Sequence, residues 1–418
     1  MAQMRVAPRV LLLMPSTSYR AHDFLSAARR LGIEVVVGSD HRQVLEDLAG
    51  GRSLSLRFTP IGEGLARILE YARQHPLRAV VGTDDESAVL AATAAKALRL
   101  RHNDPASVAL ARDKHRFRQA LVRAGMRSPW FRYIAADEDP EALARAIDYP
   151  CVLKPLGLSG SRGVIRADDA AGFVAACRRV RRILENSGGP APRGGSPILA
   201  EGFIPGREVA LEGLLEGGRL RTLALFDKPD PLDGPFFEET IYVTPSRLPE
   251  SAQREVSDEA ARAARALGLR EGPVHAELRV NGAGAWMIEL AARTIGGLCS
   301  RALGHAWGEP LEERVLRHAL ALPAHETSAS AGAAGVMMIP VPRAGRLRGI
   351  AGIDDARAVS GIREVVISVA IGERLVPPPE GDRYPGFIFA GASLPAQAEA
   401  ALRNAHAKLR FDIDPSGP

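Results

Sequence analysis

Short apolar runs alternate with amphipathic helical patterns over the first hundred residues. Residues 10–14 (VLLLM) form a continuous apolar run typical of a buried strand, and residues 33–38 (IEVVVG) are predicted to form a second buried strand. A further short strand is predicted at 79–81, and helical periodicity covers 21–31, 63–74 and 87–98. Strands alternating with helices predict an α/β unit with a parallel sheet. The turn at 15–20 lacks G-x-G-x-x-G, so no dinucleotide fingerprint is present.

An acidic run, Thr83–Asp84–Asp85–Glu86, follows the third predicted strand. It falls at the carboxyl end of a parallel strand, where α/β sheets form ligand sites. Asp84 or Asp85 can equally cap the helix that follows. Both interpretations stay open.

Two stretches rich in small residues and proline interrupt the pattern. The segment 186–197 (NSGGPAPRGGSP) predicts an exposed excursion within a domain, and SASAGAAG from Ser328 predicts a linker. Beyond the linker, residues 336–340 and 365–369 are strand-like, and 394–409 has the pattern of an amphipathic helix. The predicted domains are 1–112, 113–325 and 326–418, and the middle domain is divided into 113–196 and 197–325.

Composition and charge narrow the class of protein. With 46% hydrophobic and 25% charged residues, the chain has the composition of a globular protein. A net charge of +5 and 5% aromatic residues, with no basic run interleaved with aromatics, argue against nucleic-acid binding. The three cysteines lack metal-ligand spacing. No signal-peptide pattern and no apolar stretch of ~20 residues are found, so a cytoplasmic protein without membrane attachment is expected.

A loop rich in glycine and serine follows a predicted buried strand at 151–155 (CVLKP). Lys154 ends that strand and can neutralise phosphate oxygens as a point charge. Glycine lets backbone N–H groups approach an anion closely, and serine adds hydroxyl donors. The loop residues of this kind are Ser159, Gly160, Ser161 and Gly163. The run is not a Walker P-loop. It predicts a phosphate-binding loop, with a plain surface turn as the alternative.

A strand, a short Gly/Pro connection and a second strand follow at 198–211 (ILAEGFIPGREVAL). Such a connection leaves backbone groups free to bind a purine edge. Glu201 stands before it and Glu208 after it, and Glu208 can accept hydrogen bonds from ribose hydroxyls. A hairpin with exposed acids is the alternative.

Two glutamates occupy apolar strands joined by a hairpin turn at 281–284. Antiparallel pairing can place Glu277 and Glu289 on one face. Two buried carboxylates repel each other and need a cation, for which Mg²⁺ is the usual solution. Arg293 follows four residues later and can meet charge on a transferring phosphoryl group. The alternative is an ion pair of these glutamates with Arg279 or Arg293.

The order of these groups, over residues 75–320, resembles the ATP-grasp carboxylate–amine ligases. The resemblance implies an ATP-grasp fold with α/β and α+β parts. It adds an N-terminal Rossmann-like (pre-ATP-grasp) domain and a small C-terminal α+β domain. It also implies that Lys114 reaches the nucleotide and that Lys154 contacts the α- and β-phosphates. Ser159–Gly163 would close over ATP. Glu201, Phe203 and Ile204 would line the adenine, Glu208 would bind the ribose, and Glu277 and Glu289 would hold Mg²⁺ or Mn²⁺. The family often has Asn where this chain has Ala291, which leaves the number of metal ions open.

Within that superfamily the chain resembles the L-amino acid ligases that form dipeptides. The segment 227–246 looks like their substrate-side strand and loop, with Glu239 near the substrate amino group, and 384–413 resembles their C-terminal domain. The resemblance implies small-molecule carboxylate and amine substrates joined through an acyl phosphate, with Arg293 stabilising charge. Gly296 and Gly297 would present N–H groups to a carboxylate, or start a helix. A homodimer stays open. The alternatives are a purine-biosynthesis-type carboxylase or ligase and a catalytically silent nucleotide-binding module.

Overall fold

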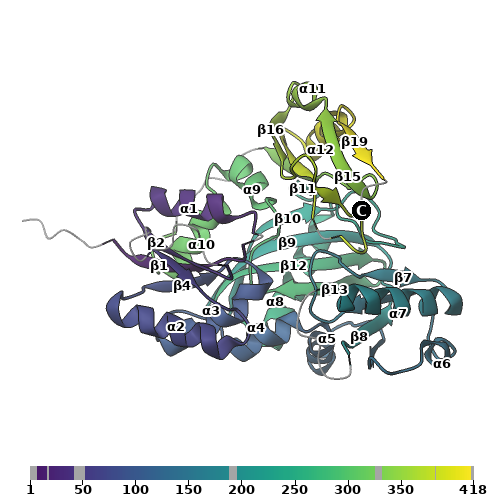
Figure 1. Ribbon diagram of the computed structural model, residues 1–418, viewed down its shortest axis with the longest axis horizontal. Coiled ribbons are helices and arrows are strands. Elements are labelled where there is room, and N and C mark those ends of the chain that lie inside the picture. The colour runs from purple at the N-terminus through teal and green to yellow at the C-terminus, as the bar shows by residue number, and fades with distance from the viewer. Residues whose placement is uncertain are drawn as a thin grey trace, which may run out of the picture.

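The protein is represented by a computed structural model that describes residues 7–16, 18–41, 52–187, 195–324, 332–381 and 383–415. Most of the predicted excursion at 186–197 and the start of the predicted linker at 328–335 lie outside these residues. The N-terminal α/β unit and a small four-stranded sheet lie at opposite ends of the molecule, with a large sheet between them (Figure 1). No described helix is long and apolar enough to cross a membrane.

The N-terminal unit is a parallel four-stranded sheet in the order β3-β2-β1-β4. Its strands are β1 (Arg9–Leu13), β2 (Glu34–Ser39), β3 (Ser53–Ser55) and β4 (Ala79–Gly82). Its helices are α1 (Ala21–Arg30), α2 (Ile61–Gln74) and α3 (Asp85–Ala97). The predicted parallel α/β arrangement is confirmed, while the three-residue strand β3 was not expected.

The small sheet is antiparallel, in the order β5-β8-β6-β7. It consists of β5 (Phe131–Ile134), β6 (Cys151–Pro155), β7 (Ile165–Ala167) and β8 (Ile198–Gly202). Helices α5 (Lys114–Arg123), α6 (Pro140–Ala144) and α7 (Ala170–Glu185) lie beside this sheet, whereas α4 (Pro105–Arg112) packs against α3. Cys151 and Cys177 are buried in the core under α7, where burial raises the pKa of each thiol to about 12. They therefore pack as small apolar residues.

The large sheet has eight strands in the order β13-β12-β9-β10-β11-β14-β18-β16. Its first five strands in the chain are β9 (Arg207–Glu216), β10 (Arg219–Asp227), β11 (Ile241–Thr244), β12 (Gly272–Asn281) and β13 (Gly284–Ala291). The others are β14 (Ala333–Met338), β16 (Ile362–Ile367) and β18 (Gly386–Ala392). Because β11 pairs with β14, hydrogen bonding crosses the predicted boundary at 325/326. The domain bounds remain predictions.

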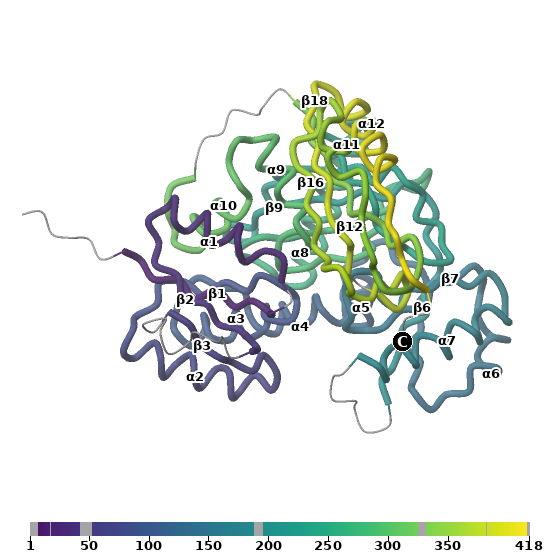
Figure 2. Tube along the Cα trace, turned by 45° about the horizontal axis from the view of Figure 1, so that its top comes forward, coloured from purple at the N-terminus to yellow at the C-terminus, as the bar shows by residue number. Residues whose placement is uncertain are grey.

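Helices cover both faces of the large sheet. They are α8 (Glu250–Leu267), α9 (Ser300–Trp307), α10 (Leu311–Ala319), α11 (Ile353–Arg357) and α12 (Pro395–His406). A three-stranded sheet of β15 (Gly345–Ala351), β17 (Arg374–Leu375) and β19 (Arg410–Asp414) adjoins the C-terminal strands, and Figure 1 labels β15 and β19. Figure 2 shows α11 and α12 beside β16 and β18. Val315 and Leu316 of α10 pack in one core with Val10 and Phe24. This contact docks the N-terminal unit beside the large sheet.

Residue alternation decides which side chains of the large sheet can form a site. On β12, Ala276 and Leu278 belong to the core under α8, so His275, Glu277 and Arg279 point to the other face. Glu212 of β9 lies directly opposite His275 in the register, and Glu208 lies opposite Arg279. One face of two neighbouring strands therefore carries a row of ionisable groups.

Candidate active site

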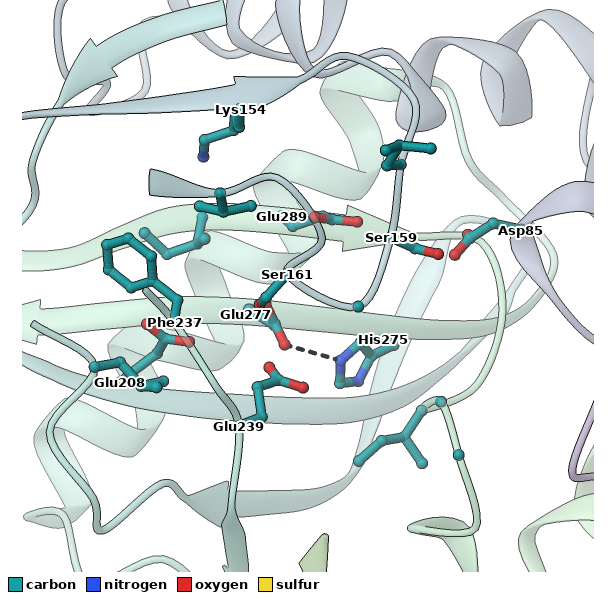
Figure 3. A pocket seen from close by; sticks show the side chains of 18 of the residues that line it. Asp85, Lys154, Ser159, Ser161, Glu208, Phe237, Glu239, His275, Glu277 and Glu289 are labelled. Atoms are coloured by element: carbon teal, nitrogen blue, oxygen red, sulfur yellow. Dashed lines mark ion pairs between the residues drawn. The ribbon is translucent and has the colours of Figure 1, made fainter. Parts of the chain in front are cut away.

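One cavity of about 380 Å³ lies where the N-terminal unit, the small sheet and the large sheet meet. All but one of the predicted site residues line it: Lys114, Lys154, Ser159, Gly160, Ser161, Glu201, Phe203, Ile204, Glu208, Glu239, Glu277, Glu289, Arg293, Gly296 and Gly297. Figure 3 shows Lys154 on the upper side of this cavity and Glu239 on the lower side. The exception is Gly163, whose N–H donates to the carbonyl of Pro379 at 2.8 Å. The roles of these residues remain proposals.

The phosphate end of the cavity is built on Lys154 of β6. Its Nζ contacts Oε1 of Glu201, and both groups are buried. Arg118 of α5 is 1% exposed and grips the same carboxylate, with Nε 2.7 Å from Oε2 and Nη2 3.1 Å from Oε1. Arg118 also donates to the carbonyl of Met287 at 2.6 Å. One carboxylate is therefore held between two cations and tied to β13.

Electrostatics at this end favour a bound anion. Burial alone raises the pKa of Glu201, but Arg118 and Lys154 outweigh burial and lower this pKa to about 2. Burial lowers the pKa of Lys154, and the neighbouring Arg118 lowers it further, against the effect of Glu201. The cluster of Arg118, Lys154 and Glu201 therefore carries one positive charge in excess. The side chain of Glu201 is bound to these two cations. If Glu201 contacts adenine as predicted, it must do so through its backbone.

The glycine-serine loop lies beside Lys114, the first residue of α5. Lys114 Nζ donates to the carbonyl of Leu158 at 2.7 Å and stands 3.7 Å from a carboxylate oxygen of Glu289. Gly160 and Ser161 both adopt positive φ, +63° and +55°. The left-handed conformation has little energetic cost for glycine but a higher one for serine. Contacts with the rest of the protein must therefore hold Ser161 in this conformation.

An apolar slot adjoins the phosphate end. Val152, Leu232 and Phe237 form a small buried cluster against Phe203. Arg279 closes the slot: its guanidinium lies 4.9 Å from the ring centre of Phe203 and donates to the carbonyl of Ile204 at 2.8 Å. A flat apolar slot with backbone groups at its edge suits a purine ring. Phe237 thus serves both pocket and core, whereas Phe236 packs against the small-sheet core.

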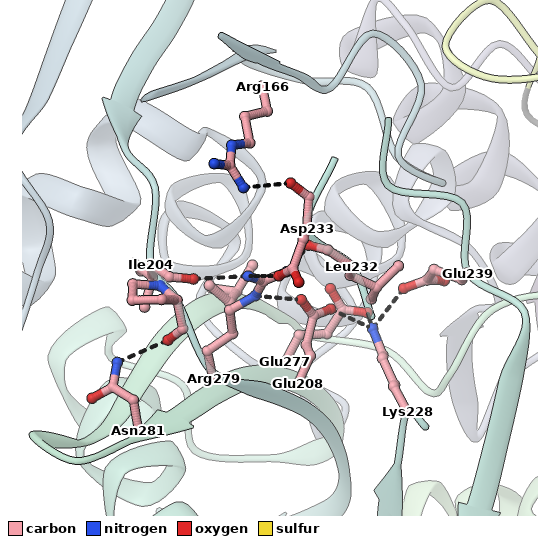
Figure 4. A network of polar contacts seen from close by, with 12 residues as sticks. Arg166, Ile204, Glu208, Lys228, Leu232, Asp233, Glu239, Glu277, Arg279 and Asn281 are labelled. Carbon is pink, nitrogen blue, oxygen red and sulfur yellow. Dashed lines mark hydrogen bonds and ion pairs between the residues drawn. The ribbon is translucent and has the colours of Figure 1, made fainter. Parts of the chain in front are cut away.

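The opposite end of the cavity is acidic. Lys228, at the end of β10, donates to Glu208, Glu239 and Glu277 at 2.8, 2.6 and 2.8 Å (Figure 4). Carboxylate oxygens of the three glutamates lie within 4.8 Å of one another. Three carboxylates thus surround one ammonium group, and the group carries negative charge in excess.

The same cluster shifts the pKa values of its members. Burial lowers the pKa of Lys228, but the three carboxylates outweigh burial and raise it well above its usual value. Burial raises the pKa of Glu239 to about 7, and the adjacent Glu277 adds to this effect against Lys228. Burial also acts to raise the pKa of Glu277, but Lys228 and His275 hold it well below its usual range. Negative charge therefore concentrates on Glu277.

The predicted hairpin of Glu277 and Glu289 is confirmed, because the two residues are register partners on β12 and β13. Glu289 is not part of the three-glutamate group, however, and faces Lys114 instead. Both residues line the cavity, and two carboxylates are a donor set that fits Mg²⁺. The assignment of Mg²⁺ to this pair remains a prediction.

The sequence interpretation missed His275 and Glu212. Nδ1 of His275 contacts Oε1 of Glu212, whose other oxygen accepts from the backbone N–H of Ile295 at 3.1 Å. Nε2 of His275 lies 3.5 Å from Glu277. Burial lowers the pKa of His275, but Glu212 and Glu277 outweigh burial and raise it to about 9. The signal was available, since His275 precedes Glu277 by two residues and so shares its strand face.

Arg293 has a partner that the sequence interpretation did not name. Its Nε and Nη2 donate to Asp85 at 2.9 and 2.7 Å, and Nη1 donates to the carbonyl of Thr294 at 3.0 Å. The alternative interpretation, an ion pair of Arg293 with Glu277 or Glu289, was therefore wrong. Burial lowers the pKa of Arg293, but Asp85 outweighs burial and raises it. Asp85 begins α3, so the N-terminal unit supplies part of the site.

The acidic run after β4 supports both interpretations left open by the sequence. Asp84 stands at the N-cap of α3 and shares a capping box with Ser87. Asp84, Asp85 and Glu86 also line the cavity. Likewise, the alternative partner of the glutamates, Arg279, pairs with Glu208 at 2.9 Å and not with Glu277 or Glu289.

Comparisons with known proteins agree with this architecture. Family models match an ATP-grasp N-terminal domain at residues 25–101, an ATP-grasp domain at 147–302 and an L-amino acid ligase C-terminal domain 2 at 337–414. The chain therefore has the domains of an ATP-grasp ligase. Its C-terminal domain is that of the L-amino acid ligases.

Individual relatives are distant. The chain is 25% identical to the uncharacterized protein y4rH of Sinorhizobium fredii, covering 97% of this chain and 84% of that protein. It is 29% identical over 57% of its length to alanine–anticapsin ligase of Bacillus amyloliquefaciens, and it spans about half (52%) of that relative. A crystal structure of an L-amino acid ligase from Bacillus licheniformis superposes with a TM-score of 0.84 at 24% identity, covering 97% of this chain and 99% of that one. That structural likeness establishes the fold.

Proposed function

We propose that the protein is an ATP-dependent carboxylate–amine ligase that joins an amino acid or another carboxylic acid to an amine through an acyl phosphate. The observation that carries the proposal is one cavity with two ends of opposite charge. Lys114 and Lys154 stand at the end suited to phosphate, and Glu239 and Glu277 stand at the end suited to cations and amines. The ligases named among the relatives support the same class of reaction.

The mechanism follows from this placement. A substrate carboxylate oxygen attacks the γ-phosphorus of ATP, which releases ADP and leaves an acyl phosphate. The amine nitrogen then attacks the acyl carbon, the carbon–oxygen bond to phosphate breaks, and the proton lost by the amine leaves with the released phosphate. Glu277 and Glu289 would hold Mg²⁺, which neutralises phosphate charge when bound. Lys154 binds phosphate oxygens, Arg293 stabilises charge at the acyl centre, and the loop 159–163 excludes water.

Two other functions share the nucleotide residues. The purine-biosynthesis enzymes of this fold superpose at 13–19% identity, which establishes the fold alone. The L-amino acid ligase domain at 337–414 favours an amide-forming ligase over them. A catalytically silent module would have no need for the buried pairing of Arg293 with Asp85 beside the two glutamates.

The decisive experiment is an ADP-release screen over amino acids, singly and in pairs, with mass spectrometry of the products. Hydroxylamine would trap an acyl phosphate as a hydroxamate. We expect ADP release, hydroxamate from the first substrate alone and an amide from the matched pair. Absence of ADP release with every pair, in a protein shown to bind ATP, would refute the proposal.

Two sets of variants serve as controls for the screen. Glu277→Gln with Glu289→Gln keeps side-chain size and should abolish the Mg²⁺-dependent reaction. Arg293→Ala should lower kcat by roughly 10²–10³ with little change in KM for ATP, the scale for losing one preorganised donor. Arg293→Lys should restore little, because a point charge cannot hold two oxygens at once.

A further inference from the structure

Tyr19, in the loop between β1 and α1, has a buried hydroxyl with no hydrogen-bond partner among the residues that the structure describes. Its side chain lines the active-site cavity. Buried hydroxyls in proteins nearly always have a partner, and an exception calls for an explanation such as an unseen ligand. None of the roles assigned above uses Tyr19.

The residues on both sides of Tyr19 are held in place by hydrogen bonds from their side chains. Ser18 Oγ donates to Asp84 at 2.8 Å, and Arg20 Nη1 donates to the carbonyl of Thr83 at 2.9 Å. The guanidinium of Arg20, which is 1% exposed, also contacts the hydroxyl of Thr294. Ser18 and Arg20 are therefore anchored on either side of Tyr19.

The ring of Tyr19 is fixed as well. It meets Phe387 of β18 edge-on, with ring centres 5.5 Å apart and planes at 77°. Phe387 is fully buried and is flanked on another side by Tyr384, which also lines the cavity. Because the neighbouring residues and the ring of Tyr19 are held in place, its hydroxyl has a preorganised position.

Tyr19 lies near the segment 293–297, because Gly297 packs closely against Phe387, the ring that Tyr19 meets. Thr294, which Arg20 contacts, directly follows Arg293 and precedes the cavity-lining stretch from Ile295 to Gly297. Arg293 and the backbone N–H groups of Gly296 and Gly297 make this the side of the cavity suited to a substrate carboxylate. A neutral O–H that donates to an anionic oxygen forms a strong, charge-assisted hydrogen bond.

We propose that Tyr19 is a further substrate-contacting residue, which donates its hydroxyl proton in a hydrogen bond to the substrate carboxylate that is activated. The inference rests on the proposed ligase function and adds a donor from the N-terminal unit to it. The ammonium or amine of either substrate is served instead by the carboxylates around Lys228, Glu239 among them. The hydroxyl binds through donation and takes no part in bond breaking.

Tyr19→Phe removes the hydroxyl and keeps the ring, so it tests the inference directly. We expect kcat/KM for the carboxylate substrate to fall roughly 10- to 100-fold, the range for a hydrogen bond to a charged group. KM for ATP should stay unchanged. The melting temperature should stay the same or rise, because no partner within the protein is lost.

Tyr149→Phe is the matched control. The Tyr149 hydroxyl donates to the carbonyl of Ala144 at 2.8 Å, in the small-sheet region and away from the cavity lining. This variant should lower the melting temperature and leave the kinetics unchanged. Both substitutions remove a tyrosine hydroxyl. Tyr19→Phe should change the kinetics without lowering the melting temperature, and Tyr149→Phe should do the reverse.

Several outcomes would overturn the inference. Wild-type kinetics in Tyr19→Phe, or a lowered melting temperature with full activity, would show a hydroxyl without a substrate role. A defect confined to the amine substrate would show that the assignment to the carboxylate is wrong. If the wild-type protein itself formed no acyl phosphate from any acid, both the ligase proposal and this inference would fail, which separates the two cases.

Discussion

The two ends of the cavity solve opposite electrostatic problems with the same kinds of side chain. At one end the single carboxylate of Glu201 is held between two cations, Lys154 and Arg118. At the other end the single ammonium of Lys228 is held among three carboxylates. The first group has positive charge in excess and the second has negative charge in excess. Each end therefore attracts the ligand charge that the other end repels.

This difference teaches how one small cavity can orient a reaction. Burial strengthens electrostatic interactions, so an excess charge there acts strongly on a ligand. Under the proposed ligase function, a polyanionic nucleotide and a substrate amine would then bind in one relative direction. Each cluster has one central group, Glu201 or Lys228, surrounded by groups of opposite charge. Variants that remove a central or a surrounding group test whether the two clusters have opposite excess charge.

Arg118→Met should give the largest effect, on stability. It leaves Glu201 with one partner and frees two backbone carbonyls of β13 that Arg118 now binds. Removing one partner of a buried pair costs roughly 3–5 kcal/mol of unfolding free energy. Urea unfolding measures this. A loss below 1 kcal/mol would mean that Arg118 does not hold the cluster together.

Lys154→Ala should act on catalysis and much less on stability. Glu201 keeps its two hydrogen bonds to Arg118, so the carboxylate is not left alone. Loss of the phosphate cation should lower turnover roughly 10²–10³-fold and weaken ATP binding. Steady-state kinetics and calorimetry provide the measurements. Nucleotide affinity at the wild-type level would show that the phosphate end is misplaced.

Lys228→Met should destabilise by roughly 2–3 kcal/mol, less than a fully buried pair, because Glu239 can take up a proton. The empty centre among three carboxylates should also become a cation site. Mn²⁺ without nucleotide should therefore raise the melting temperature of Lys228→Met more than that of the wild type. Arg118→Met is the control and should gain nothing extra. Equal gains in all three proteins would contradict the comparison.

The smallest effect concerns pH. Because the pKa of Glu201 falls from 4.5 to about 2 on folding, its carboxylate contributes stability above pH 4.5 and loses that contribution as pH falls toward 2. Roughly 2 kcal/mol should disappear between pH 4.5 and 3, at 1.36 kcal/mol per pH unit. Glu201→Gln should flatten this part of the stability profile. Parallel profiles for variant and wild type would argue against the ionised form of Glu201.

The parts of this site that could be predicted from sequence are those whose residues lie close together along the chain. Lys154 ends an apolar strand next to a glycine-serine loop, and Glu277 and Glu289 flank one hairpin. Periodicity likewise located β1, β2 and β4 of the N-terminal sheet, although not the three-residue β3. In each case the pattern and the contact lie within one supersecondary unit.

The missed residues depend on distant packing. Arg118 follows Lys114 by four residues on a helix and resembles a solvent-facing arginine until β8 and β13 cover it. Asp85 and Arg293 are 208 residues apart. Lys228 has no local neighbour that marks it, and only sheet pairing assembles its three carboxylates. The continuation of the large sheet into the C-terminal strands was missed for the same reason, since strand pairing between distant segments leaves no local periodicity.

That continuous sheet has a practical consequence for engineering. The C-terminal segment contributes β14, β18 and β16 to the same hydrogen-bonded sheet as the strands that carry Glu208 and Glu277. Exchanging this segment with that of a relative would require a matching strand register at the junction of β11 and β14. Chimeras that preserve the pairing of Ile241 with Met337 should express as folded protein. Grafts cut at the linker without regard to this register should misfold, however similar the exchanged sequences are.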